Sequence, residues 1–81
     1  MPAAARGEEA RRRLAGLTAR EREVLALLGE GLSNADAGSR LHMSEATVKT
    51  YVSRILTKLD CDNRVQAALL ARDAGLESNT G

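Results

Sequence analysis

The chain has 81 residues, 43% of them hydrophobic, and a formal net charge of +1. A chain of this length forms one small domain with a compact core, and it leaves no room for the deep cleft of a typical enzyme. Tyr51 is its one aromatic residue, so the sequence lacks the aromatic platforms on which single-stranded nucleic acids stack.

The single cysteine, Cys61, and the single histidine, His42, exclude an internal disulfide and a zinc site built from Cys and His. His42 has no carboxylate placed to orient it for catalysis. No apolar run reaches membrane-spanning length, and no signal-peptide core follows Met1. We therefore expect a soluble cytoplasmic domain that is not an enzyme and has no catalytic residue, metal, cofactor, small-molecule ligand or membrane partner.

Residues 1–16, MPAAARGEEARRRLAG, show no apolar periodicity and are rich in Ala, Arg and Glu. This composition favours a flexible N-terminal arm or linker, and the alternative is a frayed helix that runs into the domain. The run Arg11-Arg12-Arg13 could contact phosphates, although such charge runs are more often only solvated.

Two helices are predicted next along the chain. The first begins after Thr18, where TARE forms a capping box with Glu21, and ends at the glycines that follow. The second begins after Ser33 and ends near Leu41. Its interior Gly38 indicates that another backbone approaches closely. The apolar stripe of the first helix comprises Val24, Leu25, Leu27 and Leu28.

The third predicted helix begins after Ser44 and runs to Leu59. Only HMS separates it from the second helix, and such a short connection forces a steep crossing, as in a helix-turn-helix. Its apolar residues recur at the spacing of a core-facing stripe. That stripe comprises Val48, Val52, Ile55, Leu56 and Leu59, and the opposite side carries Ala46, Thr50, Ser53, Arg54 and Thr57.

The polar side of residues 45–59 suits the major groove of DNA, because short hydroxyl side chains add little bulk and bind base edges or phosphates. The alternative is a solvent-facing surface that only keeps the domain soluble. The short turn before this helix favours DNA binding, since a helix-turn-helix presents its second helix in this way. Phosphates also favour helix N-termini. The candidates there, which equally serve as caps, are Ser33, Asn34, Ser44 and Thr47.

The fourth helix is predicted from its cap Asn63 to about Asp73, and residues 77–81 are expected to form a disordered tail. This helix has two apolar sides. The residues expected to face the core are Val65, Ala68, Leu69 and Leu76. The other side is a candidate dimer interface about a two-fold axis, and it comprises Ala67, Leu70, Ala71 and Ala74.

Residues 17–76 closely resemble the LuxR-type (NarL/FixJ, GerE-like) helix-turn-helix domain. The matching pieces, in order, are LTAREREVL, GLSNADAGSRL, SEATVKTYVSRILTKL and NRVQAALLA. The resemblance implies an all-α, four-helix domain without a wing that binds specific double-stranded DNA, with residues 45–59 in the major groove. Such domains are usually the output module of a response regulator or quorum-sensing regulator, so we expect a module of this kind or a stand-alone transcription regulator.

The resemblance also implies roles for single residues. Base contacts would come from Lys49, Thr50 and Ser53, and phosphate contacts from Ser33, Asn34, Thr47, Tyr51, Arg54, Lys58 and Arg64. The fourth helix would form a weak homodimer on inverted-repeat sites, and RNA polymerase is a further candidate partner. Glu23 matches a common acidic position of the family and is expected to pair with a cation such as Arg54 or Lys58.

The sequence departs from the family pattern at several positions, among them Tyr51, which replaces a usual histidine, so that a phosphate contact there would need its phenol hydroxyl. Ala37 and Gly38 stand where the family usually has a large aliphatic residue followed by alanine, which is expected to thin the core. Asp60 stands where glycine usually ends the third helix, and an acid there opposes the helix dipole.

Two other hypotheses stay open. A sigma-factor region-4-like module shares the L-x-x-R-E-R-x-V-L opening, but the fourth helix argues against it. A protein-interaction module that has lost DNA binding is suggested by the near-zero net charge and by Asp60 and Asp62.

Overall fold

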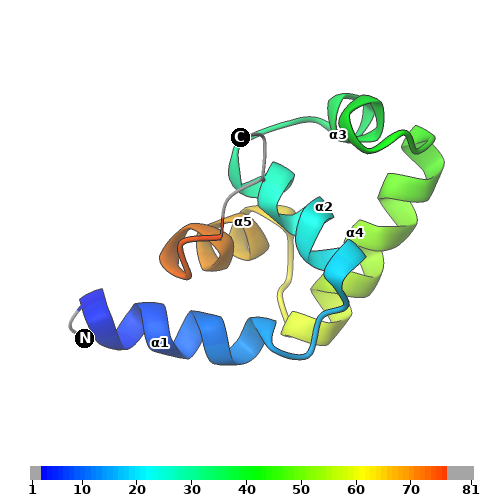
Figure 1. Ribbon diagram of the computed structural model, residues 1–81. Coiled ribbons are helices and arrows are strands. Elements are labelled where there is room, and N and C mark those ends of the chain that lie inside the picture. Colours follow the sequence, from blue (N-terminus) through cyan, green and yellow to red (C-terminus); the bar gives the residue numbers. More distant parts are fainter. Residues whose placement is uncertain (1–2, 77–81) are drawn as a thin grey trace.

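The computed structural model describes residues 3–76 (Figure 1). This part of the chain contains five α-helices and no strand: α1 (Ala3–Leu14), α2 (Ala19–Gly29), α3 (Asn34–Leu41), α4 (Glu45–Leu59) and α5 (Arg64–Asp73). None of these helices is long and apolar enough to cross a membrane. The all-α prediction is confirmed, and α2 to α5 are the four predicted helices. The predicted tail, residues 77–81, lies outside the described residues.

The starts of α2 to α5 are set by side chains that cap them. Thr18 Oγ1 accepts a bond from the Glu21 N–H at 3.1 Å, and the Thr18 N–H donates to Glu21 Oε1 at 2.8 Å, which completes the predicted capping box. Ser33, Ser44 and Asn63 accept in the same way from the third residue of their helices. Local hydrogen bonding therefore fixes all four starts.

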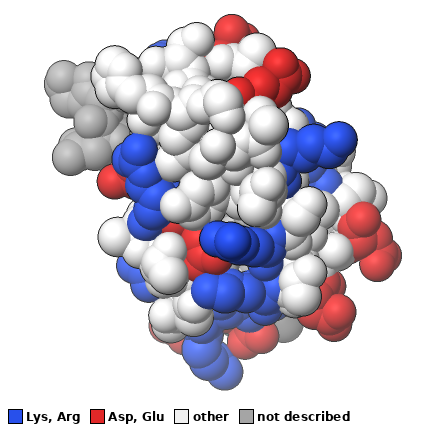
Figure 2. All heavy atoms as spheres, turned by 90° about the vertical axis from the view of Figure 1, so that its right-hand side faces the viewer, with Lys and Arg blue, Asp and Glu red and all other residues white. Residues whose placement is uncertain are grey.

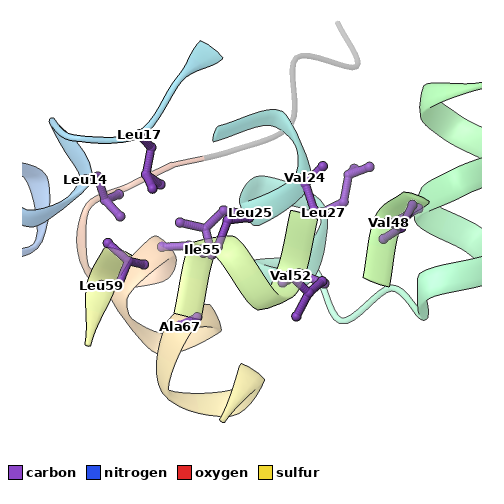
Figure 3. Close-up of a cluster of buried hydrophobic side chains, with 13 residues drawn as sticks. Leu14, Leu17, Val24, Leu25, Leu27, Val48, Val52, Ile55, Leu59 and Ala67 are labelled. Atoms are coloured by element: carbon purple, nitrogen blue, oxygen red, sulfur yellow. The ribbon is translucent and has the colours of Figure 1, made fainter. Parts of the chain in front are cut away.

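The core lies where α4 crosses α2 and α5 (Figure 3). Leu25 and Ile55 point toward one another at its centre, and each is fully buried. The predicted apolar stripes of α2 and α4 are confirmed as core, with Leu56 only half-buried. This packing stabilises one face of α4 and leaves its opposite face exposed.

Three arginines connect the ends of neighbouring helices. Arg13, Arg20 and Arg22 each donate to a backbone carbonyl at the C-terminal end of another helix. Such carbonyls have no partner within their own helix and carry partial negative charge. A guanidinium supplies both the missing hydrogen bond and a compensating positive charge. The accepting carbonyls are those of Leu59, Leu41 and Leu14, respectively.

The prediction of a flexible arm over residues 1–16 is wrong for residues 3–14, which form α1 and pack against α5. Ala10 and Leu14 are buried, and Gly7 lies against the backbone of α5, where an added Cβ would be 3.1 Å from the Asp73 carbonyl oxygen. Mostly small residues make this contact. They contribute little to hydrophobic periodicity, which is why the pattern did not indicate a packed helix.

The two sides of α5 are largely the reverse of those predicted, although Leu76, just after the helix, packs against the core as predicted and Ala68 is half-buried. Val65 and Leu69, expected in the core, are 64% and 53% exposed. The proposed dimer residues Ala67 and Ala71 are fully buried, and Leu70 and Ala74 are half-buried against the core. The predicted dimer interface is therefore mostly internal to the domain.

Close helix packing explains this reversal. An added Cβ on Gly29 of α2 would lie 3.2 Å from the Cβ of Ala71, so α2 and α5 approach at a point with almost no side chain between them. α1 contacts α5 as well. Only small residues fit on a helix that two neighbours approach so closely, so the alanines lie inside and the larger side chains outside.

The turn between α3 and α4 is held by a very close backbone approach. The Met43 N–H donates to the Gly38 carbonyl at 2.8 Å. An added Cβ on Gly38 would lie 2.5 Å from the Met43 carbonyl oxygen. The prediction of a close approach at Gly38 is confirmed. Ala37 beside it is fully buried, so the small side chains of α3 are accompanied by close packing of α3 on α4.

Gly38→Ala is expected to lower the free energy of unfolding by about 1–3 kcal/mol, because the new methyl group meets backbone that cannot rotate away. This net loss already includes the gain of about 1 kcal/mol in helix propensity, because a Cβ only 2.5 Å from a backbone oxygen is a severe clash. Urea denaturation followed by circular dichroism measures the change, with the exposed neighbour in Ser39→Ala as control. A more stable Gly38→Ala variant would contradict the close approach.

Candidate nucleic-acid interface

The candidate interface is the exposed side of α4. The predicted base-contacting residues Lys49, Thr50 and Ser53 are all exposed, and they lie within about one turn of each other. The buried side of the same helix faces α2 and α5. The structure therefore brings these three residues together on one accessible helical face.

Figure 2 shows this side of the molecule, with α3 and α4 toward the viewer. Lys and Arg side chains gather across its centre and lower part, whereas most of the Asp and Glu side chains lie toward its edges. Uncharged side chains cover much of its upper part. The net charge of the whole chain is only +1. Positive charge is nevertheless concentrated on the side where a polyanion would meet α4.

The hydroxyl groups at the helix starts act as caps. Ser33 Oγ accepts from the Asp36 N–H at 3.1 Å. Ser44 Oγ accepts from the Thr47 N–H at 3.0 Å and donates to Thr47 Oγ1 at 2.9 Å. Ser33, Ser44 and Thr47 are exposed. The structure therefore confirms the capping roles of Ser33 and Ser44, and it leaves Ser33, Ser44 and Thr47 accessible to a phosphate group.

Two predicted phosphate-contacting residues contact each other. Arg64 Nη1 donates to Asn34 Oδ1 at 2.8 Å, and Arg64 Nη2 donates to the Leu32 carbonyl at 3.0 Å. These bonds tie the start of α5 to the start of α3, although thirty residues separate the two side chains in sequence. Arg64 therefore has a structural role, whatever it contributes to a ligand.

The middle of α4 places a cation over an aromatic ring. The Arg54 guanidinium carbon lies 5.9 Å from the centroid of the half-buried Tyr51 ring. This is a cation–π distance, and it restricts the Arg54 side chain without neutralising its charge. Arg54 is exposed, so its charge is available to a phosphate beside the helix.

Lys58, also predicted to contact phosphate, forms an ion pair with Glu21 of α2. Its Nζ lies 2.8 Å from Glu21 Oε1. The expectation that Glu23 pairs with Arg54 or Lys58 is wrong, because Glu23 lies 2.6 Å from Arg20 instead. Glu21 therefore has two roles: it completes the capping box of α2, and it holds Lys58 of α4 in an ion pair.

The environment of Glu21 favours its charged form. The side-chain hydrogen bond from Lys58 and the backbone hydrogen bond from Thr18 lower the pKa of Glu21 below its ordinary value of 4.5, against a smaller opposing effect of burial. A carboxylate whose pKa is lower in the folded state stabilises the fold above its unfolded pKa, and this stabilisation is lost as the pH falls through the folded pKa.

Lys58→Met is expected to lower the free energy of unfolding by about 1–3 kcal/mol at pH 7, because it leaves the carboxylate of Glu21 with too few partners. The variant should also lose less stability than the wild type as the pH falls below 4.5. Urea denaturation at several pH values measures both effects. The control is Lys49→Met, because Lys49 is an exposed lysine of the same helix. If both variants lose the same stability at every pH, the Lys58–Glu21 ion pair does not stabilise the fold.

An exposed apolar surface on α5 was not predicted from the sequence. Val65 and Leu69, four residues apart on that helix, are the large hydrophobic side chains most exposed in the described residues. They border a shallow groove whose other wall is the C-terminal end of α2 and the loop after it, and which is lined among others by Leu28, Leu32 and Ala68. The spacing of Val65 and Leu69 was visible in the sequence, but it was assigned to the core.

Comparisons with known proteins agree with this geometry. Residues 15–71 match the family described as bacterial regulatory proteins, luxR family. The chain belongs to this family. Its LuxR-type helix-turn-helix is formed by α3 and α4, and α1 lies entirely outside the matched residues.

Three relatives illustrate the family. The chain is 50% identical over 60 residues to the "DNA-binding transcriptional activator DevR/DosR" of Mycobacterium tuberculosis, covering 74% of this chain and 28% of that protein. It is 47% identical over 55 residues both to the "Transcriptional regulatory protein LiaR" of Bacillus subtilis and to the "Response regulator protein VraR" of Staphylococcus aureus, covering 68% of this chain and 26% of each relative. The chain thus spans about a quarter of the length of these relatives.

Proposed function

We propose that this chain binds double-stranded DNA with sequence specificity, with α4 in the major groove, as the DNA-binding part of a transcription regulator. The observation that carries the proposal is that α4 has two different faces. Its apolar face is buried, and its other face presents Lys49, Thr50 and Ser53 beside a concentration of positive charge. The names of the relatives support a response regulator as the kind of protein that uses it.

Phosphates would be bound around this helix. Ser33, Asn34, Ser44 and Thr47 lie at helix N-termini, where N–H groups and the helix dipole favour an anion. Tyr51 and Arg54 flank the base-contacting residues on α4 itself. Lys58 and Arg64 are hydrogen-bonded within the domain, but ammonium and guanidinium groups have several N–H donors and can share one with a phosphate.

Dimerisation on inverted-repeat DNA would use the exposed side of α5. Val65, Ala68 and Leu69 form an apolar strip next to the groove along α2. The small area of this strip suits a weak homodimer that forms mainly on DNA, because two half-sites raise the local concentration of two copies. In this proposed dimer interface, the accessible residues Val65 and Leu69 take the place of the buried residues Ala67 and Ala71.

Lys49→Ala is expected to weaken binding to a selected duplex by about 5- to 150-fold, the loss for one good base contact. A duplex is first selected from a randomised library with the wild-type chain, and affinities are then measured by fluorescence anisotropy. Arg54→Ala should weaken binding to selected and random duplexes alike and reduce the salt dependence by about one phosphate contact.

The matched control is Arg12→Ala, which removes an exposed cation on α1 that pairs with Glu9 at 3.4 Å. It should leave affinity for the selected duplex within about twofold of wild type, because α1 packs against α5 and is not part of the proposed interface on α4. A larger loss would show that the run Arg11-Arg12-Arg13 contacts phosphate. If the Lys49→Ala and Arg54→Ala variants bind the duplexes with wild-type affinity, α4 is not the interface. A wild-type chain that binds no duplex at low salt would instead favour the protein-interaction hypothesis.

A further inference from the structure

Two threonines on the exposed side of α4 use their hydroxyl hydrogens within the helix. Thr50 Oγ1 donates to the Ala46 carbonyl at 3.2 Å, and Thr57 Oγ1 donates to the Ser53 carbonyl at 3.1 Å. Threonine hydroxyls in helices adopt this bond to the carbonyl four residues earlier. It holds the side chain in one rotamer, with the oxygen turned toward its own backbone.

This arrangement decides what the threonines offer to a groove. A hydroxyl has one hydrogen, and in both residues that hydrogen is already donated. The remaining groups are a methyl group and an oxygen that can only accept. Thr50 and Thr57 are seven residues apart, so they lie on the same side of the helix, about 10.5 Å apart along its axis. The methyl group of Ala46 lies one turn before Thr50 on the same exposed side.

The chemistry of the major groove makes this distinction informative. Guanine presents two acceptors there, adenine an acceptor and a donor, cytosine a donor, and thymine an acceptor together with the 5-methyl group. Side chains such as Lys49 and Arg54 carry donors for the acceptors. A threonine whose hydrogen is committed cannot donate to those acceptors, and its oxygen, turned toward the helix backbone, is poorly placed to accept from adenine or cytosine. Its methyl group matches the one apolar group in the groove.

We propose that Thr50 is a specificity-determining residue that contacts the 5-methyl group of a thymine through its own methyl group, and that its hydroxyl does not donate to a base. The inference rests on the proposed function, since it assumes that α4 enters the major groove. It goes further by assigning a base chemistry to one position of the recognition helix.

Two variants separate the methyl group from the hydroxyl, and one of them, Thr50→Val, is nearly isosteric with threonine. Thr50→Ser keeps the hydroxyl and removes the methyl group, and Thr50→Val does the opposite while keeping the branched shape. We expect Thr50→Ser to weaken binding to the selected duplex by about fourfold, the value of one buried methyl group, and Thr50→Val to bind as wild type does. Circular dichroism melting checks that both variants fold, which is expected because residue 50 is exposed.

The DNA supplies the matching half of the experiment. Each thymine of the selected duplex is replaced in turn by deoxyuridine, which lacks only the 5-methyl group. At one position the replacement should weaken wild-type and Thr50→Val binding by about fourfold. It should leave Thr50→Ser binding unchanged, because that variant has already lost the contact between the methyl group of residue 50 and the methyl group of the thymine. Coupling of this kind, confined to one thymine, is the signature of a direct contact.

Other outcomes overturn the inference. Weakened binding by Thr50→Val with unchanged binding by Thr50→Ser would show that the hydroxyl makes the contact. Unchanged binding by both, or equal deoxyuridine effects on Thr50→Ser and wild type, would show that no methyl contact exists. In each of these cases the wild type still binds DNA and the proposed function stands, whereas a wild type that binds no duplex overturns the proposed function and this inference with it.

Discussion

Ile55→Ala is expected to lower the free energy of unfolding by about 2–5 kcal/mol, the range for truncating a fully buried aliphatic side chain. Ile55 is fully buried and points toward Leu25 across the α2–α4 contact. Its removal leaves a cavity between two helices whose other contacts hold them in place. A domain of this size has a total stability of about 4–12 kcal/mol, so the variant loses a large part of it. Urea denaturation at 25 °C measures the change.

Ser53→Ala is the matched control, because residue 53 is exposed on the opposite side of the same helix. It should change stability by no more than about 0.5 kcal/mol and weaken DNA binding. Ile55→Ala should behave in the reverse way and bind DNA normally once its unfolded fraction is taken into account. A stability loss below about 1 kcal/mol for Ile55→Ala would contradict a core centred on the α2–α4 crossing.

The helix starts could be predicted from the sequence because their causes are local. Thr18, Ser33, Ser44 and Asn63 each accept a hydrogen bond from an N–H three residues later, so a window of four residues contains the whole signal. The buried side of α4 was equally accessible, since Val48, Val52 and Ile55 follow one helical period. The exposed position of Lys49, Thr50 and Ser53 follows from the same period.

Contacts between distant segments could not be predicted in this way. Glu21 and Lys58 are 37 residues apart, and Arg64 and Asn34 are 30 residues apart. Each pair depends on how helices cross, which no local pattern encodes. Choosing Glu23 as the partner of Lys58 failed for this reason. Two carboxylates flank Arg22, and only the packing of α2 on α4 decides which one faces the lysine.

The sides of α5 were misassigned because the spacing of its apolar residues fits either side and the contact with α1 was not predicted. Val65 and Leu69 are larger than Ala67 and Ala71, so burying them would remove more apolar surface from water. The structure has two helices close to α5, and the space between their backbones admits only small side chains. Tight packing, and not hydrophobicity alone, therefore selects the buried side.

Ala71→Glu and Leu69→Glu are expected to give opposite results on the same helix. Ala71 is fully buried against Gly29, so a carboxylate there has neither space nor a partner, and the domain should lose more than about 4 kcal/mol and unfold. Leu69 is 53% exposed, so its replacement should keep the fold. It should, however, prevent two copies from meeting through the α5 strip, because it brings two like charges together at the two-fold axis.

Circular dichroism melting measures the fold of both variants, and sedimentation on a duplex with two inverted half-sites measures the number of copies bound. Arg72→Ala serves as a control near the same strip, because it removes an exposed charge without placing a new one among apolar groups. If Ala71→Glu folds and loses the dimer while Leu69→Glu behaves as wild type, α5 is turned the other way. If Leu69→Glu still binds cooperatively as two copies, the dimer uses a surface other than the Val65–Leu69 strip, because a carboxylate at the centre of an apolar contact cannot be accommodated without a partner.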